Sequence, residues 1–484
     1  MKSIKLNMFF NVLKSVMSVI FPLITFPYAS RVLGVENMGK VQYAQSVISY
    51  FTLFASLGIS AYAVREGSKI RDNREALSRF SSEMLLITTI STTIAYLTYF
   101  IFLLMGSFNG YVVLMCITSL SIGFTTFSIE WINQIEEDFS YISIRSVAFQ
   151  FISFVLMFTF VKNANDYTIY SFLQVFSATG FFFLNLIYAR KYITVKKSYL
   201  KLNNLKRHLK PIMVIFGSSV AISIYLNLDI LILTNLKGDY QVGLYSASVK
   251  IMNVVKTLIN SITVIGVARL SWYLKHDNIK EYEVLLKNCL NSELLLLIPI
   301  CLGISMLGYY AIFIFSGEAF TPATLSCQIL GFNSVVSVVN GLFMNQYFIP
   351  AGKEKIGCFA TIAGALTNLV LDLILIPPFG LNGAAVATFL AEAIVGLVFL
   401  YYLNKAINVK YLFDQLPKII VAALPILLIC WVMIQLFSNV WLICIMSVLV
   451  SFVVYFGLLI VLKMNLANDL LRDIIGLTKR IIKK

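Results

Sequence analysis

Long apolar segments follow one another along the whole chain, and most charged residues fall between them. A helix needs about 20 mostly apolar residues to cross the hydrocarbon core of a bilayer. Each segment has about this length, which predicts about fourteen membrane-spanning helices. Their expected limits are 10–33, 40–64, 80–105, 110–133, 142–162, 167–190, 209–236, 241–268, 287–315, 323–350, 357–377, 381–404, 417–437 and 440–462.

The composition supports lipid as the solvent for this surface. Hydrophobic residues make up 59% of the 484 residues and charged residues 13%, with a mean hydropathy of +0.84. Soluble domains contain roughly 25% charged residues. A soluble protein this apolar would need a larger core than single domains build. We therefore expect an all-α membrane protein with short connections and no inserted soluble domain.

Positive residues gather on one side of the predicted membrane. Most of the 38 Lys and Arg lie in loops on the side of the N-terminus. The loops of the opposite side hold only Arg31, Lys40, Lys162 and Lys237. Because cytoplasmic loops carry the excess of Lys and Arg, both termini are expected in the cytoplasm. The net charge of +15 then reflects loops beside anionic lipid head groups, with no need for a nucleic-acid partner.

Two similar stretches indicate an internal repeat. They are RVLGVENMGKVQYAQS at 31–46 and NLKGDYQVGLYSAS at 235–248, and each carries a glycine, Gly39 or Gly243, before a predicted span. A long basic loop separates the copies. The pattern predicts two six-helix lobes plus two further helices, an arrangement that encloses a midplane cavity in many transporters. The expected divisions are an N-terminal lobe at 1–195, a basic linker at 196–208, a C-terminal lobe at 209–405, and a final helix pair with a basic tail at 406–484.

Polar side chains within the spans indicate which helix faces avoid lipid, since charges and amides are costly in hydrocarbon. Hydrogen bonding between packed helices explains the uncharged ones equally well. A mid-span lysine needs an anion or water, which favours a wet, cationic cavity for an anionic substrate such as a phosphate-bearing lipid head group. The candidate substrate-binding residues are Lys14, Arg31, Gln42, Gln45, Lys250, Asn253, Lys256, Asn260 and Asn340.

Among the carboxylates within predicted spans, the acidic candidates are Asp229, Asp372 and Glu392. They are candidates for binding a coupling cation or carrying a proton. A structural ion pair with the lysines is the alternative.

The chain lacks the motifs of common catalytic and metal sites. There is no G-x-x-x-x-G-K-[ST] loop for ATP, no G-x-S-x-G or H-E-x-x-H, and no C-x-x-C among the seven cysteines. The two histidines, His208 and His276, fall in charged loops, where we expect them to be solvated. The sequence therefore predicts no enzyme, no metal and no cofactor. Coupling to a proton or sodium gradient is left open.

Three stretches resemble the polysaccharide-transporter family, the Wzx-type repeat-unit flippases of the MOP (multidrug/oligosaccharidyl-lipid/polysaccharide) superfamily. Residues 21–74 are similar to the opening of that family, and residues 380–392 to its G-x-x-G-A-A-x-A-T-x-x-[SA]-E pattern. Residues 131–145 match W-x-x-Q-x-x-E-x-[FY]-x-Y-I-x-x-R, with Asn133 and Ile135 where an aromatic residue and a glycine are usual. The matching positions of the last stretch are Trp131, Gln134, Glu137, Phe139, Tyr141, Ile142 and Arg145.

The resemblance implies a MATE-like, alternating-access fold in the bacterial cytoplasmic membrane. It implies a substrate too: an undecaprenyl-pyrophosphate-linked oligosaccharide for O-antigen, capsule or exopolysaccharide. Its partners would be that lipid-linked glycan, membrane lipids and polysaccharide polymerase or assembly proteins. The alternatives are an exporter of the same superfamily for a lipid-linked peptidoglycan precursor or for drugs and cations. A membrane-bound glycan polymerase or ligase would need a sizeable loop on the far side, and every such loop is short.

Overall fold

The computed structural model describes residues 4–464, except 195, 197, 198, 200–204, 264, 265 and 277. This described part consists of helices joined by short loops and contains no strand. Much of the predicted basic linker, and the predicted basic tail from residue 465 on, lie outside it. An all-helical membrane protein was expected, and the fold confirms it.

Twelve helices of the described residues are long and apolar enough to cross a membrane. The first apolar stretch, Val16–Ile70, spans 55 residues, more than twice what one crossing needs. Within it, helix α1 (Ile4–Ser56) is interrupted at Gly34, whose φ of 77° and ψ of 172° are not helical. Helix α4 (Val112–Thr125) is apolar but short. A second crossing in the first stretch, together with α4, accounts for the difference from the expected fourteen.

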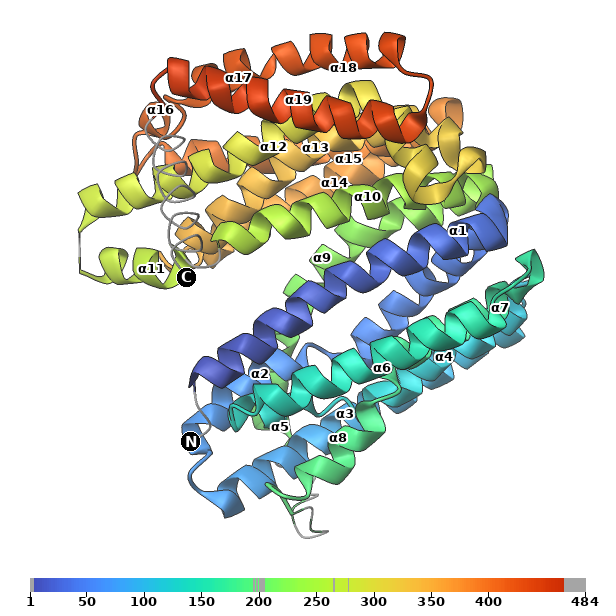
Figure 1. The fold of residues 1–484 in the computed structure, drawn as a ribbon. Helices are drawn as coiled ribbons and strands as arrows, with labels where there is room; N and C mark the ends of the chain where they lie inside the picture. Colours follow the sequence, from blue (N-terminus) through green and yellow to red (C-terminus); the bar gives the residue numbers. More distant parts are fainter. Residues whose placement is uncertain are drawn as a thin grey trace, which may run out of the picture. The chain divides into compact units, whose positions relative to one another are not determined.

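The chain reverses direction at the Gly34 break (Figure 1). The Asn37 side chain donates to the Ala164 carbonyl at one end of the unit, whereas Phe54 packs on Phe216 at the other. Glycine accepts a positive φ without steric cost, which explains why the break falls at this residue. The reversal divides α1 into two halves, which correspond to the predicted spans 10–33 and 40–64.

Contacts divide the chain into two compact units, and the boundary falls between Gly243 and Leu244. The N-terminal unit contains the helices up to α9 and the first residues of α10. Besides α1 and α4 its helices are α2 (Ile59–Gly67), η1 (Ser68–Ile70), α3 (Arg74–Leu104), α5 (Glu130–Ile135), α6 (Phe139–Phe160), η2 (Ala164–Asp166), α7 (Tyr167–Thr179), α8 (Phe182–Ala189) and α9 (Lys206–Lys237). The division into lobes at the basic linker stays a prediction.

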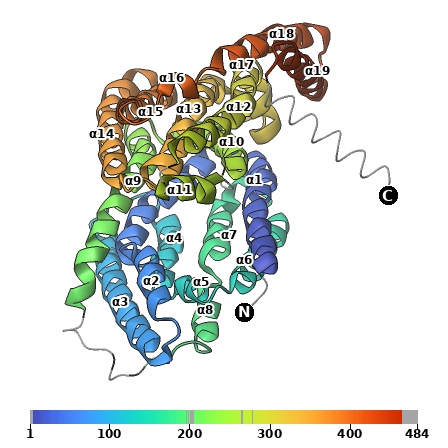
Figure 2. The ribbon, with the colours of Figure 1, turned by 90° about the vertical axis from the view of Figure 1, so that its left-hand side faces the viewer.

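The C-terminal unit begins within α10 (Asp239–Thr263). In it, α18 and α19 pack against each other and against α12 (Figures 1 and 2). Its other helices are α11 (Val267–Lys275), α12 (Ile279–Ser316), η6 (Glu318–Ala323), α13 (Thr324–Phe343), η7 (Met344–Phe348), α14 (Glu354–Phe379), α15 (Leu381–Leu403), α16 (Val409–Leu412), α17 (Leu416–Ala423), α18 (Pro425–Leu436) and α19 (Val440–Val461).

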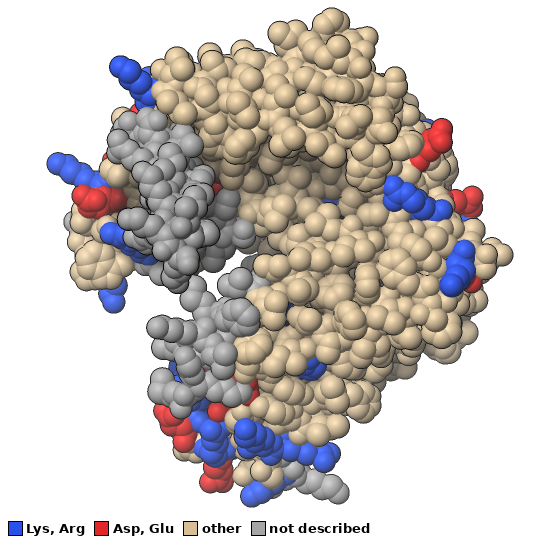
Figure 3. Space-filling model, in the orientation of Figure 1, with Lys and Arg blue, Asp and Glu red and all other residues tan. Residues whose placement is uncertain are grey.

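Large apolar side chains are exposed along the sides of many helices. Leu97 on α3 and Val453 on α19 are 60% and 70% exposed. On the face in Figure 3, Lys and Arg gather toward helix ends and uncharged residues cover the sides. A soluble protein rarely exposes apolar patches of this extent, whereas a lipid-facing surface requires them.

Candidate functional site

A cavity of about 620 Å³ lies among the apolar helices of the N-terminal unit. Side chains of α1, α4, α7 and α9 line it, and none of the described lining residues is charged. Most of the described lining residues carry a hydroxyl or an amide side chain. The polar lining residues are Gln45, Ser49, Thr52, Ser56, Thr118, Ser121, Thr125, Ser128, Gln174, Thr179 and Ser223.

Helical spacing brings these groups to one face. On α1, Gln45 is followed by polar residues four, seven and eleven positions later, and on α4 Thr118 is followed by Ser121 and Thr125. Residues three and four apart lie on the same side of a helix. Two polar stripes thus face one another across the cavity, on helices that are otherwise apolar.

The hydroxyls present acceptor oxygens to the cavity. Thr52 donates to the Ser49 carbonyl, and Thr118 and Thr125 donate to carbonyls of their own helix. A hydroxyl has one donor and two acceptor lone pairs, so a group that donates to the backbone keeps acceptor capacity. The cavity is therefore suited to a neutral ligand rich in O–H donors.

A charged cluster, Lys14–Glu130–Arg145, lies beyond the cavity lining in the same unit. Glu130 follows Ser128 by two residues, and Arg145 lies over the ring of Phe181, next to the lining residue Phe182. The Lys14 ammonium is 3.1 Å from one carboxylate oxygen of Glu130, and the Arg145 guanidinium is 2.7 Å from the other. Lys14 was predicted to bind an anionic substrate, and in the structure it forms an ion pair with Glu130.

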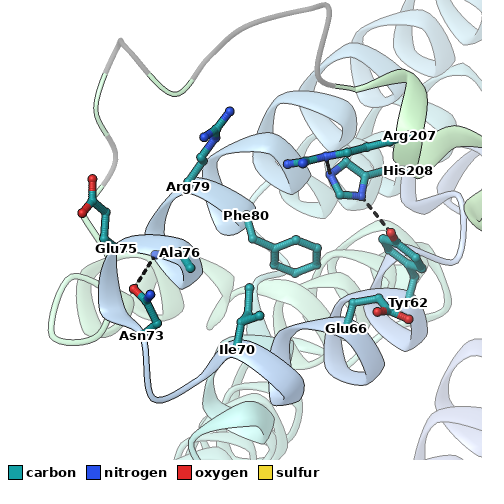
Figure 4. Close-up of a pocket in the computed structure, with 10 residues that line it drawn as sticks. All are labelled: Tyr62, Glu66, Ile70, Asn73, Glu75, Ala76, Arg79, Phe80, Arg207 and His208. Carbon is teal, nitrogen blue, oxygen red and sulfur yellow. Dashed lines mark hydrogen bonds between the residues drawn. The ribbon is translucent and has the colours of Figure 1, made fainter.

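A second pocket, of about 600 Å³, opens at the basic end of the unit, between α2, α3 and the start of α9. Figure 4 shows His208 between Arg207 and Tyr62, with Phe80 facing the pocket. His208 is only 5% exposed, so the prediction of a solvated histidine was wrong. Its ring nitrogens lie 2.7 Å from the Tyr62 hydroxyl and 2.9 Å from the buried Glu83 carboxylate.

Glu83→Gln is expected to loosen the attachment of α9 to α3. The Glu83 side chain is fully buried and accepts from Arg207 at 2.6 Å as well as from His208. Breaking a buried ion pair on one side leaves the other charges uncompensated. The midpoint of thermal unfolding should fall by on the order of 5 °C. Glu75→Gln, on an exposed rim residue of the same pocket, is the matched control and should leave the midpoint within about 1 °C.

The remaining candidates of the N-terminal unit are dispersed. Gln45 lines the cavity, and Gln42 is half-buried one turn away on α1. Arg31 is exposed and donates to the Pro27 carbonyl at 2.7 Å. Asp229 is buried in α9, where its charge acts on Tyr50.

The C-terminal unit brings three candidates, Asn340, Glu392 and Lys256, into one region. Asn340 on α13 donates to the Glu392 carboxylate of α15 at 2.7 Å and to its backbone carbonyl at 2.9 Å. Lys256 on α10 lies 3.5 Å from Ser337 of α13, and the charge of Glu392 acts on it. Sequence reasoning named all three residues and gave pairing of the carboxylates with the lysines as an alternative, but it did not place Asn340 beside Glu392.

Other candidates of this unit stand apart from that region in their contacts. Lys250 is half-buried and forms no ion pair with any residue in the described part of the chain. Asn253 and Asn260 are exposed along α10. Asp372 is fully buried on α14 and accepts from Asn368 at 3.1 Å. The residues described contain no cluster that could hold a metal ion.

Each of the two repeat glycines lies against the helix that carries the other one, within the N-terminal unit. A Cβ on Gly39 of α1 would lie 1.9 Å from the Asp239 carbonyl oxygen, and one on Gly243 would lie 1.9 Å from that of Val35. Beside this crossing, the Tyr111 hydroxyl donates to the Asp239 carboxylate at 2.8 Å. Burial and this carboxylate raise the pKa of Tyr111, so its hydroxyl stays protonated as the donor.

The many apolar helices, the basic loops and the polar cavity define a multi-pass membrane transporter. Residues 4–266, more than half of the chain, match the family described as "Polysaccharide biosynthesis protein". The chain belongs to this family, as its sequence motifs predicted. It is a membrane transporter of polysaccharide biosynthesis.

Comparisons with individual proteins agree. The chain is 25% identical over 414 residues to a protein of Escherichia coli K12 named "Putative O-antigen transporter", covering 83% of this chain and 97% of that protein. The lipid II flippase MurJ shares the fold with a TM-score of 0.77 at 18% identity, over 97% of this chain and 100% of MurJ. An inward-facing MATE transporter of the MOP superfamily follows with a TM-score of 0.65 at 14% identity, over 80% of this chain and 94% of that one. The expected MOP/MATE-like fold is confirmed.

Proposed function

We propose that the chain is a flippase. It moves an undecaprenyl-pyrophosphate-linked oligosaccharide from the inner to the outer leaflet of the bacterial cytoplasmic membrane by alternating access. The observation that carries this proposal is the uncharged, hydroxyl-lined cavity inside the N-terminal unit. Sugar hydroxyls are donors that match its acceptor oxygens, and the polyprenyl tail stays in lipid. The chain performs no chemistry on the glycan, and its termini lie in the cytoplasm.

The lining argues against a drug or cation exporter. A cavity for cations needs carboxylates, and the described lining of this one has none. Glu392, with Asn340 and Lys256 beside it, is our candidate for a proton or sodium site in the C-terminal unit. Asp229 and Asp372 remain further candidates. Polymerase and assembly proteins would receive the glycan on the far side.

Reconstituted protein tests this function directly. The purified chain is placed in proteoliposomes with a fluorescent lipid-linked oligosaccharide, and a membrane-impermeant glycosidase reports how fast sugars appear on the other leaflet. We expect transport above that of protein-free vesicles and of vesicles with an unrelated membrane protein. Faster movement of a lipid-linked peptidoglycan precursor would contradict the proposal and identify the chain as an exporter of that precursor. Uptake of a cationic dye without glycan movement would identify it as a drug or cation exporter.

Thr52→Val combined with Thr125→Val removes two cavity hydroxyls and keeps side-chain shape. Each lost hydrogen bond to the glycan costs on the order of 1 kcal/mol, so the loss of two should slow transport by about thirtyfold. Thr93→Val is the matched control, because Thr93 is exposed on α3 and donates to the Thr89 carbonyl in the same way. Equal rates for the double variant and for Thr93→Val in the glycosidase assay would show that the cavity does not contact the glycan.

A further inference from the structure

The charges of the Lys14–Glu130–Arg145 cluster do not balance. Both oxygens of Glu130 are occupied, one by each cation. No second carboxylate in the described part of the chain pairs with Lys14 or Arg145. Two positive groups thus share one negative group, and one positive charge remains. An uncompensated charge next to apolar helices is costly unless an anion or water compensates it.

Arg145 carries unused donors. Its side chain is only 3% exposed. Its Nε and Nη1 groups are buried without a hydrogen-bond partner among the described residues. The guanidinium lies 4.4 Å from the centre of the Phe181 ring and 5.3 Å from that of Tyr141, which fix its plane but accept no strong hydrogen bond. Buried cationic donors left unpaired call for further anionic oxygens.

The cluster is also open to a ligand. Lys14 and Glu130 are 35% and 20% exposed, so a ligand can reach these two residues, and displacement of Glu130 then frees a donor of the buried Arg145. It adjoins the cavity through Ser128 and Phe182, which line the cavity two residues and one residue from Glu130 and Phe181. A molecule whose sugars occupy the cavity would bring its linking group toward these charges.

We propose that Lys14 and Arg145 bind the diphosphate of the lipid-linked substrate, and that Glu130 holds this pair when the substrate is absent. The proposal rests on the proposed function and names the residues for one part of the substrate. A diphosphate has several anionic oxygens and more charge than one carboxylate, and guanidinium binds such oxygens through two parallel hydrogen bonds. It therefore compensates both cations and displaces Glu130.

Two substitutions distinguish this role from that of a structural ion pair by the direction in which each changes diphosphate binding. In a purely structural cluster, loss of Glu130 or of Lys14 would weaken the fold, and neither would improve binding. In a ligand site, Glu130→Gln removes a competitor and should tighten diphosphate binding, whereas Lys14→Gln removes an attractive charge and should weaken it. Amide and carboxylate have the same shape, so the first change alters little besides charge.

The test uses the full chain in nanodiscs of uncharged lipid and measures binding of undecaprenyl diphosphate, with undecaprenol as the uncharged probe. We expect about threefold to tenfold tighter binding for Glu130→Gln and about tenfold weaker binding for Lys14→Gln. Arg145→Lys should also weaken binding, since it keeps charge but loses the paired donors. Lys40→Gln is the control: its ion pair with Glu36 lies elsewhere on α1, and binding should not change.

Several outcomes overturn the proposal. Unchanged or weaker binding for Glu130→Gln, or equal affinity for undecaprenol, would make the cluster structural. Displacement of the diphosphate by equal amounts of phosphatidylglycerol would assign the shared phosphate chemistry to ordinary lipid head groups. If wild-type protein moves glycan in proteoliposomes while Glu130→Gln and Lys14→Gln bind the diphosphate as wild type does, the flippase stands and only this site fails. No glycan movement by the wild type would instead remove the proposed function.

Discussion

Replacing Gly243 by alanine is expected to cost the protein much of its folded population and nearly all of its transport. The new Cβ would lie 1.9 Å from the carbonyl oxygen of Val35 and 2.8 Å from its carbonyl carbon. Those atoms belong to backbone, so no flexible side chain can move aside, and α1 and α10 must separate. Overpacking of this kind costs about 3 kcal/mol or more where backbone has to shift. Gly39→Ala, 1.9 Å from the Asp239 oxygen, should act similarly.

Two other helical glycines serve as controls that distinguish the effect of the close contact from the general effect of replacing glycine by alanine in a helix. Gly303 in α12 and Gly217 in α9 have no atom within 4 Å of the position of a Cβ. Alanine favours helix over glycine by about 1 kcal/mol, so Gly303→Ala and Gly217→Ala should unfold at the same temperature as the wild type or slightly higher. Thermal unfolding of the four variants, followed by the glycosidase assay, measures the contrast. Similar behaviour of Gly243→Ala and Gly303→Ala would mean that α1 and α10 do not need this close approach.

The spans were predictable because their signal is local. About twenty apolar residues specify a membrane crossing without reference to any other helix. The conformation of Gly34, where the first stretch breaks, follows from the freedom of glycine at positive φ. The repeat pointed to Gly39 and Gly243, yet no spacing rule says that each would approach the other's helix. That contact depends on how helices pack.

The cavity was predictable only in part, for a similar reason. Gln45 stood out as an amide within an apolar span, but Thr118, Ser121 and Thr125 did not. Single hydroxyls are common in membrane helices, where they bond to their own backbone or to a neighbour. They become a cavity lining only when α1, α4, α7 and α9 are arranged around one space.

Charged partners were the hardest to predict. A lysine within a span indicated a missing anion, yet Glu130 is 116 residues away from Lys14. His208 was expected in solvent because its sequence neighbours are basic, while Glu83 and Tyr62 enclose it from α3 and α2. Local sequence gives the cost of a buried charge, and only the packed helices give its partner.

Asn340→Leu should destabilise the C-terminal unit more than the double change Asn340→Leu with Glu392→Leu. Asn340 donates to both the carboxylate and the backbone carbonyl of Glu392, which is only 8% exposed. Without the amide, a buried carboxylate loses its short hydrogen bond, and leaving such a group unsatisfied costs about 1–3 kcal/mol or more. Replacing both partners by apolar groups removes the polar atoms along with the bond, so part of the loss should return.

The same cycle tests whether Glu392 couples transport to an ion gradient. If Glu392 only ties α13 to α15, the double variant should recover transport together with thermal stability. Its transport should then respond to an imposed proton or sodium gradient as that of the wild type does. If Glu392 carries the ion, the double variant regains its unfolding temperature, but its transport no longer accelerates when a gradient is applied across the proteoliposome membrane. Stability and gradient response then separate, because hydrogen bonding between α13 and α15 can be replaced by packing whereas an ionisable group beside Lys256 cannot.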